Sequence, residues 1–199
     1  NFKKHKQSII TIASREDISK TIDLLIKSSK AVIVAGGGIK NTKGDKEVIS
    51  IAKKLNIPIV TSAGHGDALS SEENLYAGQM GPRGNIVATN LVRKADVILA
   101  LGTRLGFNST FFSYENLNKK ALIIQVDIEP SSLGRYFPIA LGICADSKNF
   151  AKQLYKRLSK IKNLKKTKLW TKNFLKEKKI YLKKREDEAN FINPIQPSA

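Results

Sequence analysis

The chain has 199 residues, of which 41% are hydrophobic, and its 35 Lys and Arg against 17 Asp and Glu give a formal net charge of +18. This length accommodates one domain plus an extension, and no apolar run reaches the roughly 18 residues that a membrane span needs. The single cysteine, Cys144, excludes an intrachain disulfide, and with His5 and His65 it cannot supply a zinc site of the usual kind. We therefore expect a cytoplasmic protein without a membrane or metal partner.

The positive charge would suit a nucleic-acid binder, but its distribution along the chain argues against that function. From Lys160 onward there are 12 Lys or Arg against 4 acids, and the remaining excess is spread without an obvious basic stripe. Lysine also greatly outnumbers arginine, whereas base readout and bidentate phosphate contacts favour arginine. We interpret the charge as a lysine-rich solvated surface plus a linker, and we expect no nucleic-acid partner.

Apolar runs and helical patterns alternate along residues 1–160. Ser14 with Asp17 three residues later is a capping-box start for a helix with Ile18 and Ile22 on one face. In chain order, the pattern predicts strands at 31–35, 57–61, 96–101, 122–127 and 139–143, helices at 45–55, 85–94 and after Asp146, a helical turn at 131–134, and loops at 70–84 and 107–118. Short Val, Ile, Leu and Ala runs are typical of strands buried on both faces. They predict an α/β fold with a Rossmann-like, doubly wound, mostly parallel sheet of five to six strands and helices on both faces.

The composition changes after Lys160. Trp170, Phe174, Ile180 and Tyr181 stand sparsely among lysines, and the chain ends in a proline-punctuated segment. These apolar residues are too few to offset the entropy of ordering the segment. We therefore expect residues 161–199 to form a Lys-rich linker that is poorly ordered and open to proteolysis unless a neighbouring domain holds it.

The first candidate binding element is the turn Gly36-Gly37-Gly38, which follows the strand predicted at 31–35. Glycines in such a turn let backbone N–H groups approach a phosphate closely. The pattern G-x-G-x-x-G is incomplete, because Asn41 stands where the third glycine is required. No acid ends the next strand near Thr61, where the ribose of NAD would need one. A plain NAD site is therefore not expected, and a tight turn without a ligand remains the alternative.

Three charged residues follow predicted strands at the carboxyl edge of the sheet, where open α/β sheets bind ligands. Asp127 could accept hydrogen bonds from ribose hydroxyls or cap the turn that follows it. Arg104 could bind a diphosphate in a bidentate manner or pair with an acid at the sheet edge. Asp146 could face the ligand or serve only as a helix N-cap.

The loop from Gly78 to Gly84 holds three glycines and the only methionine, Met80. Its glycines would allow close backbone approach to a flat ring, and packing turns are the alternative. His65 stands between two glycines with no legible Ser-His-Asp or Cys-His arrangement, so we interpret it as a loop residue. Cys144 lies in a predicted strand and is expected in the core.

Several of these segments together resemble the central domain of thiamine-diphosphate-dependent enzymes of the acetolactate synthase group. The resemblance covers roughly residues 15–160 and rests on matching order and spacing of the strand and turn at 31–38, the loop at 78–84 before a helix, the segment 95–104 and the segment 126–130. Acetolactate synthases typically continue the Gly-x-Arg segment with Phe-Asp-Asp-Arg, whereas this chain has Leu105-Gly106-Phe107-Asn108. In that respect it is more similar to the sulfoacetaldehyde acetyltransferase branch.

The resemblance implies a thiamine-diphosphate-dependent transferase in which this domain binds FAD, which plays no redox part, or ADP, or nothing. The nucleotide contacts it implies are Gly36, Gly37, Gly38, Gly78, Met80, Gly81, Arg104, Asp127, Ile128 and Asp146. The family's activating glutamate and its Gly-Asp-Gly motif for Mg²⁺ and thiamine diphosphate are not found in this sequence, so no catalytic or metal-binding residue is predicted.

The same resemblance, with the opening at Asn1 in place of Met, identifies the chain as a piece of a longer polypeptide that is inactive alone. Flanking pyrimidine-binding and diphosphate-binding domains are implied in that polypeptide, as is a homo-oligomeric parent enzyme. The alternative from another class is a stand-alone nucleotide-binding module of sirtuin-like or flavoprotein type. A sirtuin-type deacylase would normally bring four zinc-binding cysteines, and one cysteine argues against it.

Overall fold

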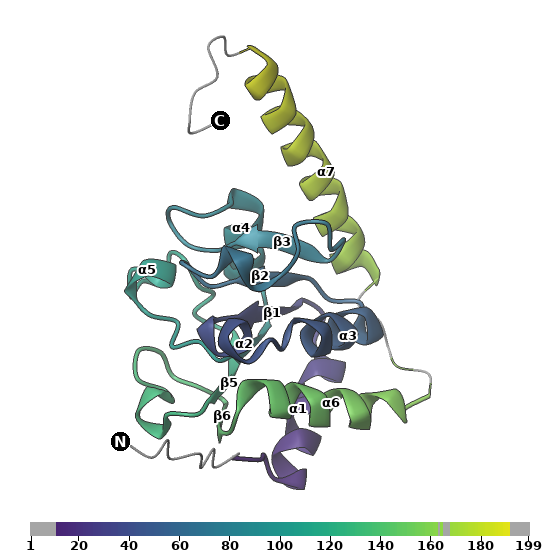
Figure 1. Cartoon of the computed structure of the whole chain (residues 1–199), viewed down its shortest axis with the longest axis vertical. Helices are drawn as coiled ribbons and strands as arrows, with labels where there is room; N and C mark the ends of the chain where they lie inside the picture. The colour runs from purple at the N-terminus through teal and green to yellow at the C-terminus, as the bar shows by residue number, and fades with distance from the viewer. Residues whose placement is uncertain (1–10, 163, 165–167, 192–199) are drawn as a thin grey trace, which may run out of the picture.

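The computed structural model describes residues 11–162, 164 and 168–191. Its centre is a six-stranded sheet in the order β3-β2-β1-β4-β5-β6 (Figure 1), and every neighbouring pair is parallel. The strands are β1 (Ala31–Ala35), β2 (Ile59–Thr61), β3 (Tyr76–Gln79), β4 (Val97–Leu101), β5 (Leu122–Asp127) and β6 (Leu141–Cys144). This strand order is that of the doubly wound dinucleotide-binding fold, so the predicted fold class is confirmed.

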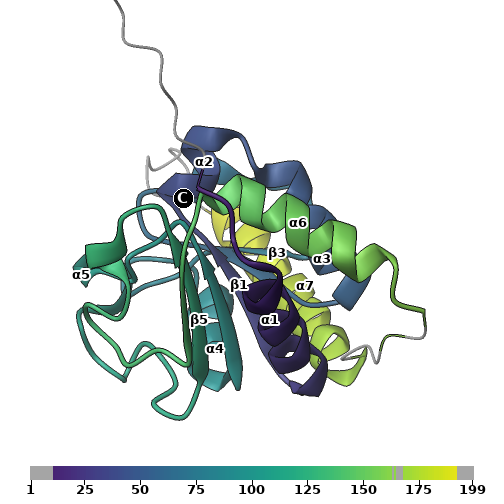
Figure 2. The ribbon, with the colours of Figure 1, turned by 90° about the horizontal axis from the view of Figure 1, so that it is seen from below.

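Helices cover both faces of the sheet. They are α1 (Arg15–Lys27), α2 (Gly37–Thr42), α3 (Asp45–Leu55), α4 (Ile86–Lys94), α5 (Phe107–Thr110), α6 (Ser147–Ser159) and α7 (Lys168–Phe191), with 3₁₀ turns η1 (Gly66–Ala68) and η2 (Pro130–Ser132). Helices α1, α3 and α6 share one hydrophobic core with the sheet, whereas α4 and α7 contribute to the other. Helices α1 and α6 lie side by side in both ribbon views (Figures 1 and 2). No helix in the described ranges combines the length and the apolar character needed to cross a bilayer.

The central strand β1 shows why these apolar runs became buried strands. All five of its residues are completely buried. Because side chains alternate along a strand, Ile33 enters the core beside α1, α3 and α6, while Val32 and Val34 enter the core beside α4 and α7. Full burial of a Val or Ile side chain contributes about 1.5–3 kcal/mol. A strand that is covered on both faces therefore requires an unbroken apolar run.

Some short elements were not predicted from the sequence. The range 70–84, expected as a loop, contains strand β3, and the glycine turn continues into helix α2. The range 107–118, also expected as a loop, begins with the four-residue helix α5. Strand β3 is an edge strand whose pairing with β2 shifts register. Its four residues are too few to show an alternation of apolar and polar side chains. Helix α2 begins with two glycines, which have low helix propensity. Short length and low helix propensity make such elements hard to predict from the sequence.

The expectation that Cys144 lies in the core is wrong. Cys144 is exposed, and its Sγ donates to the carbonyl oxygen of Ile128 at 3.6 Å. Strand β6 is the last strand of the sheet, and of its four residues Ile143 is the buried one. An edge strand has only one neighbour, so a residue in it is less completely covered than one in the centre.

The expectation of poor order after Lys160 does not hold for residues 168–191, whereas residues 192–199 of the expected linker lie outside the described residues. Residues 168–191 form α7, and Phe174 is only 1% exposed in the second core. The indole N–H of Trp170 donates to the carbonyl oxygen of Ala31 at 2.9 Å, and Tyr181 packs against the same core. Ile180 is 61% exposed, and the second half of the helix projects beyond the sheet (Figure 1). Trp170, Phe174 and Tyr181 therefore pack against the domain, whereas Ile180 remains exposed.

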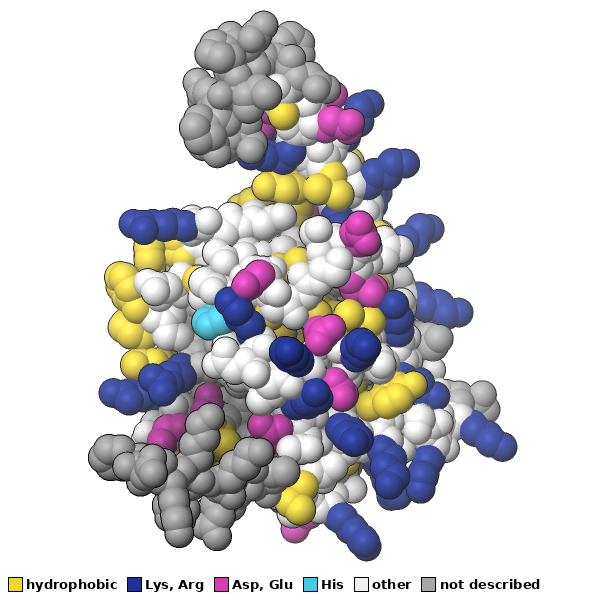
Figure 3. Space-filling model, viewed as in Figure 1, with side chains coloured by type: hydrophobic (Ala, Val, Ile, Leu, Met, Phe, Trp, Pro, Cys, Tyr) yellow, Lys and Arg dark blue, Asp and Glu magenta, His cyan; other side chains and the backbone are white. Residues whose placement is uncertain are grey.

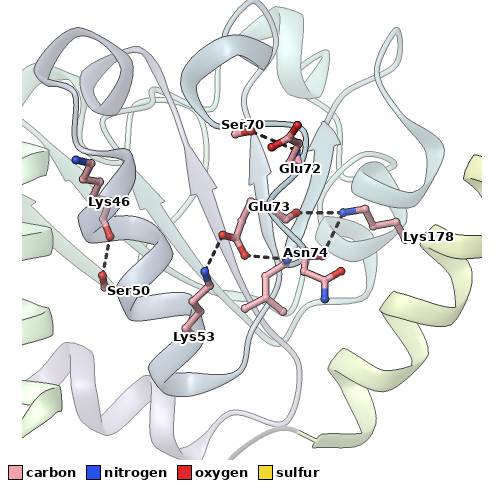
Figure 4. A network of polar contacts seen from close by, with 9 residues as sticks. Lys46, Ser50, Lys53, Ser70, Glu72, Glu73, Asn74 and Lys178 are labelled. Atoms are coloured by element: carbon pink, nitrogen blue, oxygen red, sulfur yellow. Dashed lines mark hydrogen bonds and ion pairs between the residues drawn. The ribbon is translucent and has the colours of Figure 1, made fainter.

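A polar network around Glu73 joins α3, the loop before β3 and α7 (Figure 4). The Glu73 carboxylate pairs with Lys53 of α3 at 2.9 Å and accepts from the backbone N–H of Leu75 at 3.4 Å. The Lys178 ammonium of α7 donates to the carbonyl oxygens of Glu73 and Asn74 at 3.1 and 3.2 Å. Partial burial raises the pKa of Glu73, but the contacts with Lys53 and Leu75 outweigh it and lower that pKa. Burial lowers the pKa of Lys178.

Substitution Glu73→Gln should therefore lower the free energy of unfolding at neutral pH by about 1 kcal/mol. The folded-state pKa of Glu73 lies below its ordinary value of 4.5, so its carboxylate stabilises the fold above that pH. The contribution is lost as the pH falls through the folded-state value, so the two proteins should converge in stability below pH 4.5. Urea unfolding across the acidic to neutral range measures this, with Glu72→Gln, an exposed neighbour, as the control. A difference that is independent of pH would contradict the assignment.

Candidate functional site

A candidate site lies at the carboxyl ends of the strands, between β1 and β4. From β1 the chain order continues outward through β2 and β3, whereas β4 begins the run through β5 and β6 on the other side. Such a switch point leaves a crevice in which open α/β sheets bind their ligands. A cavity of about 610 Å³ opens there, within the ~300–1,000 Å³ that small-molecule sites occupy. Residues from the segments that follow β1, β2, β4, β5 and β6 line it.

The glycine turn after β1 is held tightly against the end of β4. Gly36 N–H donates to Leu101 O at 2.9 Å, and Gly38 N–H donates to Gly102 O at 3.0 Å. A Cβ at Gly36 would overlap Gly102 O and lie 2.5 Å from Thr103 Cβ, and one at Gly38 would lie 2.7 Å from Gly102 Cα. Gly36 does not line the cavity, so its role is the close packing of the two segments. Gly38 packs in the same way and also lines the cavity.

His65 lies in a loop, as predicted, but it also forms part of the cavity wall. A Cβ at Gly37 would lie 2.7 Å from His65 Nε2, so the absence of a side chain at Gly37 makes room for the ring. His65 Nδ1 lies 3.1 Å from both Ser62 Oγ and Ala63 O. In one neutral tautomer Nδ1 would donate to the Ala63 carbonyl oxygen, and in the other it would accept from the Ser62 hydroxyl.

Arg104 follows β4 and brings a positive charge to the cavity. Its side chain is exposed and makes no hydrogen bond or ion pair with any residue in the described ranges, so the salt bridge considered as an alternative is not formed there. A hydrogen bond from Ser131 lowers the pKa of Glu129, and the charge of Arg104 adds a smaller effect in the same direction. The next residue, Leu105, is buried with a φ of +50°, a conformation that is uncommon for a branched side chain. Such strain concentrates at functional sites.

Two carboxylates border the cavity, and each has one structural role. Asp127, at the end of β5, is 9% exposed, and its Oδ1 accepts from Glu129 N–H at 2.9 Å. Asp146 Oδ1 caps α6 by accepting from Asn149 N–H at 2.8 Å. The capping alternatives for both residues are thus observed. The second carboxylate oxygen of each has no hydrogen-bond partner in the described part of the chain, which leaves it available to a ligand.

The structure gathers only some of the predicted site residues. Six of the ten line the cavity: Gly37, Gly38, Arg104, Asp127, Ile128 and Asp146. Met80 is completely buried in the core to which α4 and α7 contribute, so its side chain is not accessible to a ligand in the cavity. Gly78 and Gly81 adopt φ values of +104° and +111°, which fits their alternative role as turn glycines, and neither lines the cavity.

Several lining residues carried no signal in the sequence. They are small polar residues and one aromatic: Asn41, Thr42, Ser62, Thr103, Asn108, Ser109, Ser147 and Phe107. Phe107 stacks on Phe111 with ring centroids 4.8 Å apart, and Phe112 lies 4.5 Å from Tyr136. Hydrophobic side chains gather at the edge of the molecule where α5 lies (Figure 3). Only the clustering of aromatic residues after β4 could have pointed to this rim.

The cavity is bordered by one cation, Arg104, and by two carboxylates, Asp127 and Asp146. Within the described ranges there is no group of three or more His, Cys, Asp or Glu placed to hold a metal ion. Around one cavity, Arg104 and the backbone N–H groups of the glycine turn can donate hydrogen bonds to an anion, and the two free carboxylate oxygens can accept hydrogen bonds from hydroxyls.

Comparison with known proteins places this chain in a family. Residues 18–154 match the family described as thiamine pyrophosphate enzyme, central domain. The chain therefore belongs to that central-domain family, as the sequence resemblance indicated.

Its relatives include two kinds of enzyme. A probable sulfoacetaldehyde acetyltransferase of Rhizobium meliloti (strain 1021) is 36% identical over 144 residues, 71% of this chain and 24% of the relative. The sulfoacetaldehyde acetyltransferase of Roseovarius nubinhibens is 36% identical over 146 residues, 72% and 24% of the two chains. The acetolactate synthase large subunit of Buchnera aphidicola subsp. Schizaphis graminum is 30% identical over 180 residues, 89% and 31%. The matched region thus spans about a quarter to a third of the length of these relatives.

Substitution Gly36→Ala should destabilise the fold by about 1–3 kcal/mol, because the added methyl group must displace backbone at the junction of β1 and β4. Gly66→Ala is the matched control, since a Cβ there would meet only Gln79 Oε1 at an ordinary 3.6 Å. Urea unfolding compares the two variants with the wild type. Equal stability of both variants would show that the turn tolerates a side chain and that close packing is not the role of Gly36.

Proposed function

We propose that this chain is the central domain of a thiamine-diphosphate-dependent carboligase or acyltransferase of acetolactate synthase type. Support comes from its family and from relatives of two kinds, acetyltransferases and acetolactate synthases. Sulfoacetaldehyde acetyltransferase is the narrower alternative, favoured by the higher identity and by the segment Leu105–Asn108. The parent enzyme would be a cytoplasmic homo-oligomer that carries pyrimidine-binding and diphosphate-binding domains in the same polypeptide.

The thiamine diphosphate and Mg²⁺ of the parent would be held by those other domains. The sequence contains no Gly-Asp-Gly triplet, and its carboxylates at the cavity are engaged in caps through one oxygen each. When bound, thiamine diphosphate would supply the carbanion chemistry that transfers a two-carbon unit. This chain would contribute a framework and a second, nucleotide-binding site.

For that site we propose FAD or ADP as the ligand. The observation that carries the proposal is that Arg104 and Asp127 Oδ2 border one cavity without partners in the described ranges. A diphosphate would pair with the Arg104 guanidinium, which can donate two parallel hydrogen bonds. A ribose hydroxyl would donate to Asp127 Oδ2. The turn at Gly37 and Gly38 lines the same cavity, so its backbone would lie close to the phosphates.

Substitutions Arg104→Ala and Asp127→Ala should each weaken ADP or FAD binding about tenfold or more, since a charge-assisted hydrogen bond contributes about 1.5–3 kcal/mol. Calorimetry with both nucleotides measures the affinities. Arg83→Ala and Asp23→Ala, at exposed positions outside the cavity, remove the same charges and should leave affinity unchanged. If neither cavity variant weakens either nucleotide, these residues do not form the site.

The chain alone should be catalytically silent when supplied with pyruvate, thiamine diphosphate and Mg²⁺. The reason is that the sequence contains no Gly-Asp-Gly motif of the kind that holds Mg²⁺ and the diphosphate in the family that the chain resembles. Acetolactate formation is followed by a colorimetric assay, with an intact acetolactate synthase as the positive control. Carboligation above background by the 199-residue chain would refute the assignment of the chemistry to other domains.

A further inference from the structure

A second cavity lies between α1 and α6, away from the switch point. Its volume is about 490 Å³, and it shares no residue with the first cavity. The lining residues come from α1 and from the last turns of α6 with the residue that follows: Arg15, Ile18, Ser19, Gln153, Lys156, Arg157 and Lys160. We refer to it as the α1–α6 groove. In Figure 3, Lys and Arg side chains gather over this part of the face, where α6 and α1 lie in Figure 1.

The groove is lined by four cations and no acid. None of the four takes part in an ion pair within the described part of the chain. Nearby acids are already engaged, because Glu16 pairs with Lys20 at 2.7 Å and Asp17 completes the capping box with Ser14. Like charges that converge without a counterion repel one another, so this arrangement favours the binding of an anion.

Helix electrostatics account for only part of this cluster. Lys156 and Arg157 lie in the last turn of α6, where the helix dipole favours a cation. Arg15 is the first residue of α1, where the dipole disfavours a cation. The stability of its own helix therefore gives no reason for a cation at Arg15.

Gln153 adds an independent observation. Its Nε2 is shielded from solvent and has no hydrogen-bond partner in the described ranges. A buried donor without an acceptor costs stability, and a rotation of the Gln153 amide toward the groove would let a ligand oxygen accept from it. With Ser19, the polar groups that line the groove can all donate hydrogen bonds.

We propose that the α1–α6 groove binds a small polyanion with two or more linked phosphate groups. Its volume lies in the ~300–1,000 Å³ range of small-molecule sites, and cations from two helices can reach different phosphates of one ligand. This site is separate from the nucleotide site proposed above and does not depend on it.

Calorimetry of the 199-residue chain with inorganic tripolyphosphate, at about 0.15 M salt to screen nonspecific attraction, tests the proposal. The double substitution Arg15→Gln with Arg157→Gln should weaken binding about tenfold or more, because two charge-assisted contacts are lost. The control Lys27→Gln with Lys152→Gln removes the same charge from exposed positions on the same two helices outside the groove, and should change affinity by less than about twofold. Circular dichroism verifies that all variants are folded.

Two further variants distinguish binding in the groove from binding in the first cavity. Gln153→Glu places a carboxylate in the groove and should weaken tripolyphosphate binding at least as much as the groove double variant. Because the first cavity could also take a phosphate chain through Arg104, the titrations are repeated in the Arg104→Ala background, where the groove variants should still weaken binding. Binding that is lost in Arg104→Ala and that the groove variants leave unchanged would overturn the proposal by placing the anion in the first cavity.

Two other results would also overturn the proposal. Equal weakening by the groove and control double variants would mean that tripolyphosphate is held by nonspecific attraction to the positive surface. Binding of a poly-glutamate peptide without binding of tripolyphosphate would mean that the groove takes an acidic protein segment.

Discussion

The close approach of two backbone segments at the β1–β4 junction is the constraint on which the site depends. Gly38 N–H donates to Gly102 O at 3.0 Å, and Gly102 N–H donates in turn to Val126 O at 2.8 Å, so the ends of β1, β4 and β5 are joined by one chain of backbone contacts. Side chains at Gly36 or Gly38 would force these segments apart. The cavity has a fixed outline because its three central walls are tied to one another.

In the proposed nucleotide site, the same side chains would combine structural and binding roles. Asp127 and Asp146 each cap a backbone N–H through one oxygen and keep the other free in the described part of the chain. The caps orient the carboxylates before any ligand arrives, which reduces the entropy lost on binding. Arg104 is different, because no side chain in the described ranges fixes it. We infer that Arg104 is the adaptable element of an otherwise preorganised site.

The sequence predicted those elements whose pattern is local and strong. Strands β1 and β5 and helix α3 have the predicted bounds, because each is a continuous apolar run or a clear helical face. Helix α7 was missed because its apolar residues are stabilised by a distant core, which local composition does not reveal. The site was predicted in part for the same reason. Arg104 and Asp127 stand at the ends of strands that are easily predicted from the sequence. Whether Met80 is buried in the core, and which polar residues line the cavity, depends on how the whole chain packs.

The central claim is that the switch-point cavity holds a nucleotide through these particular groups. A crystal structure of the chain grown with ADP tests it most directly. We predict that the diphosphate lies against Arg104 and the turn at Gly37 and Gly38, with a ribose hydroxyl on Asp127 Oδ2. ADP bound at another place, or in this cavity without contact to Arg104 and Asp127, would contradict the claim.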